Sequence, residues 1–163
     1  MPRYEHDPSK VTTTLQVLPK GDYEFIIKGI KSFVRTASAG HQSYGVRYSL
    51  EVAEGLAKGK RAVVSSYLHS EGGEQMAKQI LIAAYGFQVN DAGEREFDEA
   101  VAGGDWSINP DDQSIGDAYK EMIGKRVAND LDVEMQHSKF IGGSPDTDSP
   151  MVERQVFGTW RPI

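Results

Sequence analysis

The 163-residue sequence contains no cysteine. This absence excludes disulfide-stapled scaffolds, cysteine-ligated zinc sites and thiol-based catalysis or redox chemistry. No apolar run approaches the ~20 residues that cross a bilayer as a helix. The first residues also lack the apolar segment of a secretory signal peptide. We therefore expect a protein of the cytoplasm that does not enter a membrane.

The motifs of the common enzyme classes are absent as well. The chain has no glycine-rich dinucleotide or phosphate-binding motif, no G-x-S-x-G and no H-E-x-x-H. Its four histidines are scattered, without partners at the spacing of metal ligands. We expect no catalytic residue, no metal site and no cofactor, so that a binding function is favoured.

Charge is distributed unevenly along the chain. The formal net charge is -6, but residues 20–61 carry eight basic against four acidic residues. Residues 62–124 carry three basic against twelve acidic residues. Because a polyanion responds to the local patch rather than to the whole-chain charge, one part of the domain is expected to attract an anion.

Alternating apolar residues predict five strands, over residues 21–33, 44–52, 60–68, 127–133 and 151–160. Gly29 interrupts the first strand, either as a bulge or as an incidental surface glycine. Helical spacing predicts a helix over 74–85 that Gly86 ends. Asp91 with Glu94, and Ser114 with Asp117, are interpreted as capping pairs that open two further short helical segments.

The order of three strands, a helix, an insertion and two strands is typical of the five-stranded Greek-key barrel called the OB-fold. A split sandwich or another decorated barrel fits the pattern too. We expect a mainly β protein with one or two helices (α+β). It would comprise an N-terminal arm (1–19) and an OB-like domain (20–163) with an acidic helical or loop insertion at about 91–117, between strands 3 and 4.

Basic and aromatic residues are interleaved in the positively charged part. Single-stranded nucleic acid is bound by this combination, because cations neutralise phosphates and aromatic rings stack on unpaired bases. The candidate phosphate contacts are Lys28, Lys31, Arg35, Arg47, Lys60, Arg61, Lys125, Arg126 and Lys139. The candidate stacking residues are Phe33, Tyr44, Tyr48, Tyr67 and Phe140.

Strand alternation leaves two roles open for Tyr44 and Tyr48. Arg47 lies between them in the sequence, so an unbent strand directs it to the face opposite the tyrosines. The tyrosines are therefore either core residues or stacking platforms.

Several motifs occur in a recognisable order: Gly21-Asp22-Tyr23 opening a strand, Glu54-Gly55 with Lys58-Gly59-Lys60-Arg61 in a turn, a helix, and Ile123-Gly124-Lys125-Arg126-Val127. Over residues 19–160 this order resembles the single-stranded DNA-binding proteins encoded by bacteriophages. The resemblance implies an OB-fold that coats single-stranded DNA with little sequence preference during phage replication or recombination, without catalysis.

Many proteins of that family recruit partners through an acidic tail, whereas the acids here lie internally, at 91–117. This segment is our candidate surface for replication or recombination proteins, and self-association into a homo-oligomer stays open. Two other interpretations remain. One is a structural or assembly β-protein such as a virion component. The other is a metal-dependent nuclease that uses Asp130, Asp132 and Glu134, which alternate along one predicted strand.

Overall fold

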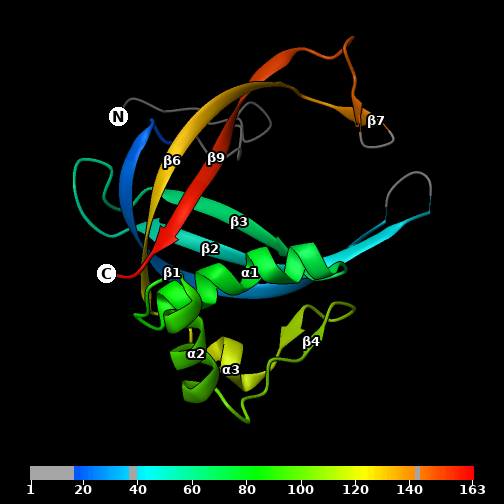
Figure 1. The fold of residues 1–163 in the computed structure, drawn as a ribbon. Coiled ribbons are helices and arrows are strands. Elements are labelled where there is room, and N and C mark those ends of the chain that lie inside the picture. The colour runs from blue at the N-terminus through cyan, green and yellow to red at the C-terminus, as the bar shows by residue number, and fades with distance from the viewer. Residues whose placement is uncertain (1–16, 37–39, 142–143) are drawn as a thin grey trace, which may run out of the picture.

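Five long strands form one antiparallel sheet (Figure 1). The structure, a computed structural model, describes residues 17–36, 40–141 and 144–163, with Phe140 and Ile141 described by their backbone alone. Most of the predicted arm lies outside these ranges. The strands are β1 (Gly21–Thr36), β2 (Gln42–Val52), β3 (Arg61–Tyr67), β6 (Arg126–His137) and β9 (Met151–Arg161), in the spatial order β3-β2-β1-β6-β9. The expectation of a mainly β chain is confirmed, but within the described residues the sheet is not closed between β3 and β9.

Shorter elements lie in the two long connections. Between β3 and β6 come α1 (Glu71–Ala84), α2 (Asp91–Ala100), α3 (Asp117–Lys120) and the hairpin of β4 (Ile108–Asn109) and β5 (Ser114–Ile115). Between β6 and β9 come β7 (Phe140–Ile141) and β8 (Ser144–Pro145). The described chain thus has three helices rather than one or two. In Figure 1 the far ends of β6 and β9 rise together beyond the other three strands.

The predicted irregularity at Gly29 is a β-bulge. The pairing of β1 with β2 shifts between Ile27 and Gly29, so that Lys28 is the extra residue. β1 pairs with β6 from Gly21 to Ile26, and with β2 from Phe25 onward. The bulge therefore lies next to the point where β1 changes its pairing partner, which fits the tendency of bulges to bend a strand.

The core lies on one face of the sheet and is covered by α1. Phe25, Ile27, Leu50 and Val52 alternate along β1 and β2 and are buried. Ile80 of α1 belongs to the same apolar cluster, and Figure 1 shows α1 lying across the sheet. This packing explains why the period-two pattern of the strands and the helical pattern near residue 80 were both readable in the sequence.

The predicted helix starts after α1 are displaced. Asn90, rather than Asp91, caps α2, because its side-chain oxygen accepts the Gly93 N–H at 2.8 Å. Ser114 caps no helix; it lies in β5, and α3 begins only after Gly116. The prediction of Ser114 as a cap was wrong because this residue pairs with Asn109 instead.

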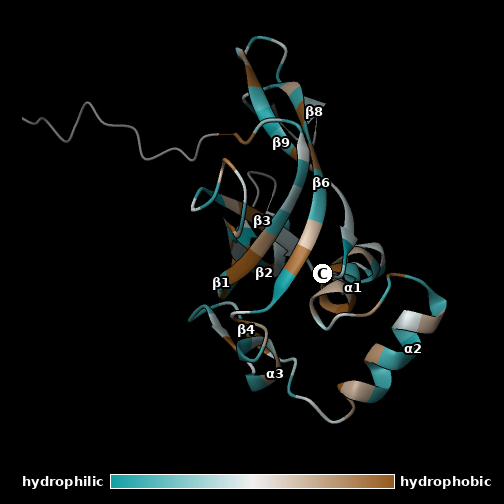
Figure 2. Ribbon diagram, turned by 90° about the vertical axis from the view of Figure 1, so that its left-hand side faces the viewer, coloured by the Kyte–Doolittle hydropathy of each residue, from teal (hydrophilic) through white to brown (hydrophobic). Residues whose placement is uncertain are grey.

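The acidic segment 91–117 is packed onto the domain through aromatic side chains. The Trp106 ring lies 6.0 Å from Phe97 of α2 and 4.9 Å from Tyr119 of α3, measured between ring centroids. Tyr85 completes this group at 5.4 Å from Phe97. Most of α2 is nevertheless hydrophilic (Figure 2). The segment thus contributes apolar residues to the core and directs its charges outward.

Ser32 should act as an anchor for the β4–β5 hairpin. Its buried hydroxyl lies 2.6 Å from the Ser114 carbonyl oxygen and 3.0 Å from that of Asn109. Ser32→Ala leaves these acceptors without their buried donor, so we expect a loss of about 1–3 kcal/mol in the free energy of unfolding. Denaturant titration measures this loss, and Ser49→Ala, an exposed serine of β2, serves as the control. Equal stability of the two variants would contradict the anchor role.

Candidate nucleic-acid interface

The face of β1, β2 and β3 opposite the core, here called the outer face, carries several of the predicted binding residues. Ile30, Tyr48 and Val64 lie opposite one another in register on the core side. The next register position brings Lys31, Arg47 and Ser65 together on the outer face. We call this set the basic row. Residues from three strands, separated by up to 34 positions in the sequence, thus form one surface.

Lys31 and Arg47 are directly opposed across β1 and β2. Two like charges in this position destabilise a sheet unless something compensates them. Among the described residues neither side chain forms an ion pair. The Arg47 guanidinium instead lies 4.9 Å from the centroid of the Phe33 ring, and its Nε donates to the Ser65 hydroxyl at 3.4 Å. The sheet therefore holds two cations side by side without a carboxylate.

An aromatic row of Phe33, Gly45 and Tyr67 lies beside the basic row. Phe33 meets Tyr67 edge to face at 5.6 Å between ring centroids. Gly45 is required between them, since a Cβ atom there would collide with the carbonyl oxygen of Ser66. Phe33 is only 6% exposed, so it forms a floor beneath Arg47 rather than a free stacking surface, whereas Tyr67 is 37% exposed.

His69 extends the aromatic row and was missed by the sequence analysis. Its ring lies 5.7 Å from Tyr67 and 6.1 Å from Tyr44, between centroids. Tyr44 is 40% exposed at the start of β2. We had considered His69 only as a metal ligand. The sequence did offer a signal. His69 follows Tyr67 by two positions, and in an extended chain this spacing directs both side chains to the same face.

Of the two roles left open for Tyr48, the structure supports the core residue and not the stacking platform. Its side chain is 1% exposed and lies in the core between Ile30 and Val64. Burial raises its pKa well above the ordinary value of a tyrosine. Strand alternation directs the Tyr48 and Arg47 side chains to opposite faces of the sheet, and β2 does not bend enough to bring them onto one face.

Other predicted cations are engaged elsewhere. Lys28 pairs with Glu51 at 3.7 Å, and Arg126 pairs with Glu54 at 3.6 Å. The Lys125 ammonium lies 4.5 Å from the centroid of the Tyr85 ring, which belongs to the aromatic group that packs segment 91–117. The structure therefore does not bring these three residues into the basic row.

The remaining predicted residues lie around the margins. Arg35 is exposed near the end of β1, and Arg61 opens β3 opposite Glu51. Lys60 is exposed in the turn before β3. Lys139 follows β6 in the connection to β9, and the side chain of Phe140 lies outside the described residues.

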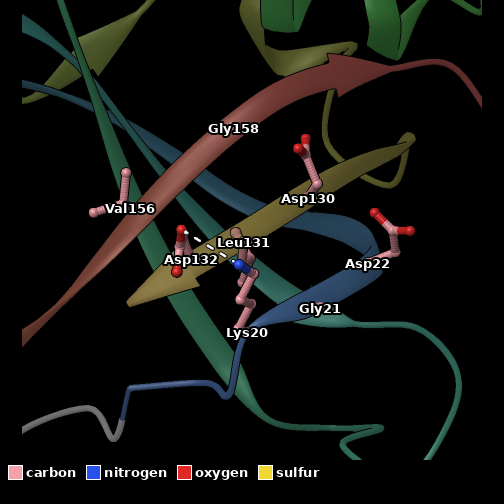
Figure 3. A pocket seen from close by; sticks show the side chains of 8 residues that line it. All are labelled: Lys20, Gly21, Asp22, Asp130, Leu131, Asp132, Val156 and Gly158. Atoms are coloured by element: carbon pink, nitrogen blue, oxygen red, sulfur yellow. Dashed lines mark ion pairs between the residues drawn. The ribbon is translucent and has the colours of Figure 1, made fainter. Parts of the chain in front are cut away.

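Around the first half of β1, where it pairs with β6, the same side of the sheet is acidic (Figure 3). Lys20, Asp22, Asp130 and Asp132 line a shallow hollow there. The acids have separate partners: Asp132 pairs with Lys20 at 3.9 Å, and Asp22 pairs with Arg161 at 3.0 Å. In the ranges that the structure describes, no three histidine or acidic residues are placed to hold a metal ion. The acids considered for a nuclease, Asp130, Asp132 and Glu134, are therefore not gathered into a metal site.

Comparison of the chain with protein-family models finds no match, and comparison with curated proteins finds none either. Over the described ranges, no helix has both the length and the apolar character needed to span a membrane.

The two tyrosines of β2 should differ in what their removal does to stability. Tyr48→Ala empties a buried aromatic site, so we expect a loss of about 3–5 kcal/mol in the free energy of unfolding. Tyr44→Ala changes an exposed residue, and we expect a loss of no more than ~0.5 kcal/mol. Chemical denaturation of both variants tests this difference. A stable Tyr48→Ala variant would show that the residue is not part of the core.

Proposed function

We propose that the protein binds single-stranded DNA with little sequence preference, through the outer face of β1, β2 and β3, and that it does so without catalysis. The observation that carries this proposal is the uncompensated pair Lys31 and Arg47 beside an aromatic row. A bound phosphate would relieve the repulsion between the two cations, so the apo surface already favours an anion.

The neighbouring rings favour a single strand over a duplex. Bases stack on aromatic side chains only when they are unpaired and can turn outward. Tyr67 lies in the register position next to the basic row, and the rings of His69 and Tyr44 continue from it toward the start of β2. Stacking accepts every base and phosphate contacts carry no sequence information, so we infer that sequence preference is low.

We further propose that the sheet is an OB-type barrel that is open between β3 and β9. The strand order, the sharing of β1 between β2 and β6, and the location of α1 between β3 and β6 support this assignment. In OB-folds the face of strands 2 and 3 binds oligonucleotides, which is where the basic row lies. The elements between α1 and β6 would then be the acidic insertion.

Phage replication or recombination in the cytoplasm of a host cell is the setting that we propose, on the strength of the sequence resemblance. The acids of α2 suit a role in recruiting proteins. Asp91, Glu96 and Glu99 are exposed there, while Lys78 of α1 pairs with Glu94 and Asp98 at 2.8 Å. A basic partner held there would complement this charge.

Salt dependence tests the phosphate contacts. Affinity for oligo-dT, followed by fluorescence anisotropy, should fall steeply with salt, and Lys31→Gln should reduce the log–log slope by about 0.7, the value of one phosphate contact on a single strand. Lys120→Gln removes an exposed lysine of α3 and should leave the slope unchanged. A slope that is flat in the parent protein, or equal losses in both variants, would contradict the proposed surface.

Tyr67 tests the stacking contribution. Tyr67→Ala should weaken oligo-dT binding by about 1–3 kcal/mol and leave the salt slope unchanged, because a ring but no charge is lost. Tyr67→Phe keeps the ring and should retain the affinity of the parent protein. If the phenylalanine variant binds as weakly as the alanine variant, the tyrosine acts through its hydroxyl and not by stacking.

A further inference from the structure

The outer edge of β3 exposes backbone hydrogen-bonding groups. At the two ends of the β2–β3 pair, Leu68 N–H donates to the Tyr44 carbonyl at 2.9 Å, and Val52 N–H donates to the Lys60 carbonyl at 2.8 Å. The register between them is continuous. Because hydrogen-bonded and non-hydrogen-bonded pairs alternate in an antiparallel ladder, the even-numbered residues of β3 bond to β2. The odd-numbered residues, Arg61, Val63, Ser65 and Tyr67, therefore direct their N–H and C=O groups away from β2.

Apart from Arg61 at its first position, this edge lacks the usual protection. Natural proteins guard edge strands with charged residues, prolines or bulges. The stretch from Ala62 to Tyr67 has no charge and no proline, and its pairing with β2 shows no bulge. Val63 is 39% exposed. The other end strand, β9, differs: it carries Glu153, Arg154 and Arg161, and a register shift interrupts its pairing with β6. Among the described strands, none pairs with the free edge of β3.

We propose that two copies of this chain associate by antiparallel pairing of their β3 strands, centred on Val64. In this register Arg61 of each copy lies opposite Tyr67 of the other, Val63 lies opposite Ser65, and Val64 lies opposite itself. The odd-numbered residues then exchange hydrogen bonds across the junction. A shift of the centre to residue 63 or 65 leaves one end of the seven-residue strand unpaired.

The side chains support the same register. Arg61 and Tyr67 are both on the outer face, so each guanidinium of the pair meets an aromatic ring of the second copy. Directly opposed residues in a sheet have Cβ atoms ~4.5–5.5 Å apart, which is within reach of a cation–π contact. No like charges are opposed, and the smaller residues Ala62 and Ser66 meet on the core side.

Pairing of this kind places the outer faces of both copies on the same side of one continuous sheet. The two basic rows then face the same direction. The association itself requires only β3, so it does not depend on the proposed DNA binding. A dimer would, however, offer a longer surface to a bound DNA strand.

Light scattering coupled to size-exclusion chromatography tests the proposal. The parent protein should have twice the 18.0 kDa mass of one chain. Val63→Pro removes an N–H that points to the free edge, where proline is tolerated, and should give a folded monomer. Val63→Ala keeps the N–H and should remain a dimer. A parent protein of 18.0 kDa at its highest soluble concentration, or a dimeric Val63→Pro variant, would overturn the proposal.

A cysteine introduced into this cysteine-free chain tests the register. Val64→Cys places two thiols on opposed non-hydrogen-bonded positions, whose Cα atoms are ~4.5 Å apart and suit a disulfide. Oxidised glutathione should therefore produce a covalent dimer. In Val63→Cys the two thiols are offset by two residues, beyond the ~7 Å Cα limit for a disulfide, and should cross-link far more slowly. Equal cross-linking of both variants would overturn the register.

The DNA assay distinguishes this proposal from the proposed function. If Val63→Pro is monomeric and still binds oligo-dT with the salt slope of one basic row, both proposals stand. If the parent protein is monomeric and binds, only the dimer is wrong, and if it is dimeric without binding, only the DNA-binding function is wrong.

Discussion

The extra residue in β1 determines which side chains reach the outer face. Before the bulge, the odd-numbered residues Phe25 and Ile27 face the core, and after it the even-numbered residues Ile30 and Ser32 do so. A strand without the bulge would keep the odd-numbered phase and turn Lys31 into the core, where an unpaired ammonium is costly. One inserted residue thus keeps the apolar side of β1 continuous and moves the next basic and aromatic residues to the outer face.

The charges of the outer face are divided between the two halves of the sheet. The first half of β1, with β6 and β9, carries Asp22, Asp130 and Asp132, and Lys20 and Arg161 pair with two of them. The second half, with β2 and β3, carries Lys31 and Arg47 without such partners. A chain of net charge -6 therefore presents a local positive surface, since its acids are either compensated nearby or placed on other elements.

Period-two alternation allowed the strands to be predicted from the sequence, and it also separated Arg47 from Tyr48. Gly29 indicated either a bulge or an incidental surface glycine, and the register of β1 with β2 shows the bulge. The pairing of Lys28 with Glu51 and of Arg126 with Glu54 could not be predicted, because each joins residues from separate strands or turns that only the fold brings together. His69 was missed for the same reason, because it joins the candidate site through its contacts with Tyr44 and Tyr67, which only the fold brings together. The N-cap of α2 was predicted one residue late, at Asp91 instead of Asn90, because both of these neighbouring residues are able to cap a helix.

If the outer face binds phosphate as we propose, Phe33 holds one of its cations in place before the phosphate arrives. Its ring is almost fully covered, and part of that cover is the Arg47 guanidinium. An arginine packed on an aromatic ring loses side-chain freedom in the free protein, while its planar face and outward N–H groups remain available to an anion. Less entropy is then lost when a phosphate binds than would be lost for a freely moving lysine. Lys31 lacks such a floor, so the two neighbouring cations would contribute differently: Arg47 as the preorganised contact, and Lys31 as the charge that draws the phosphate toward it.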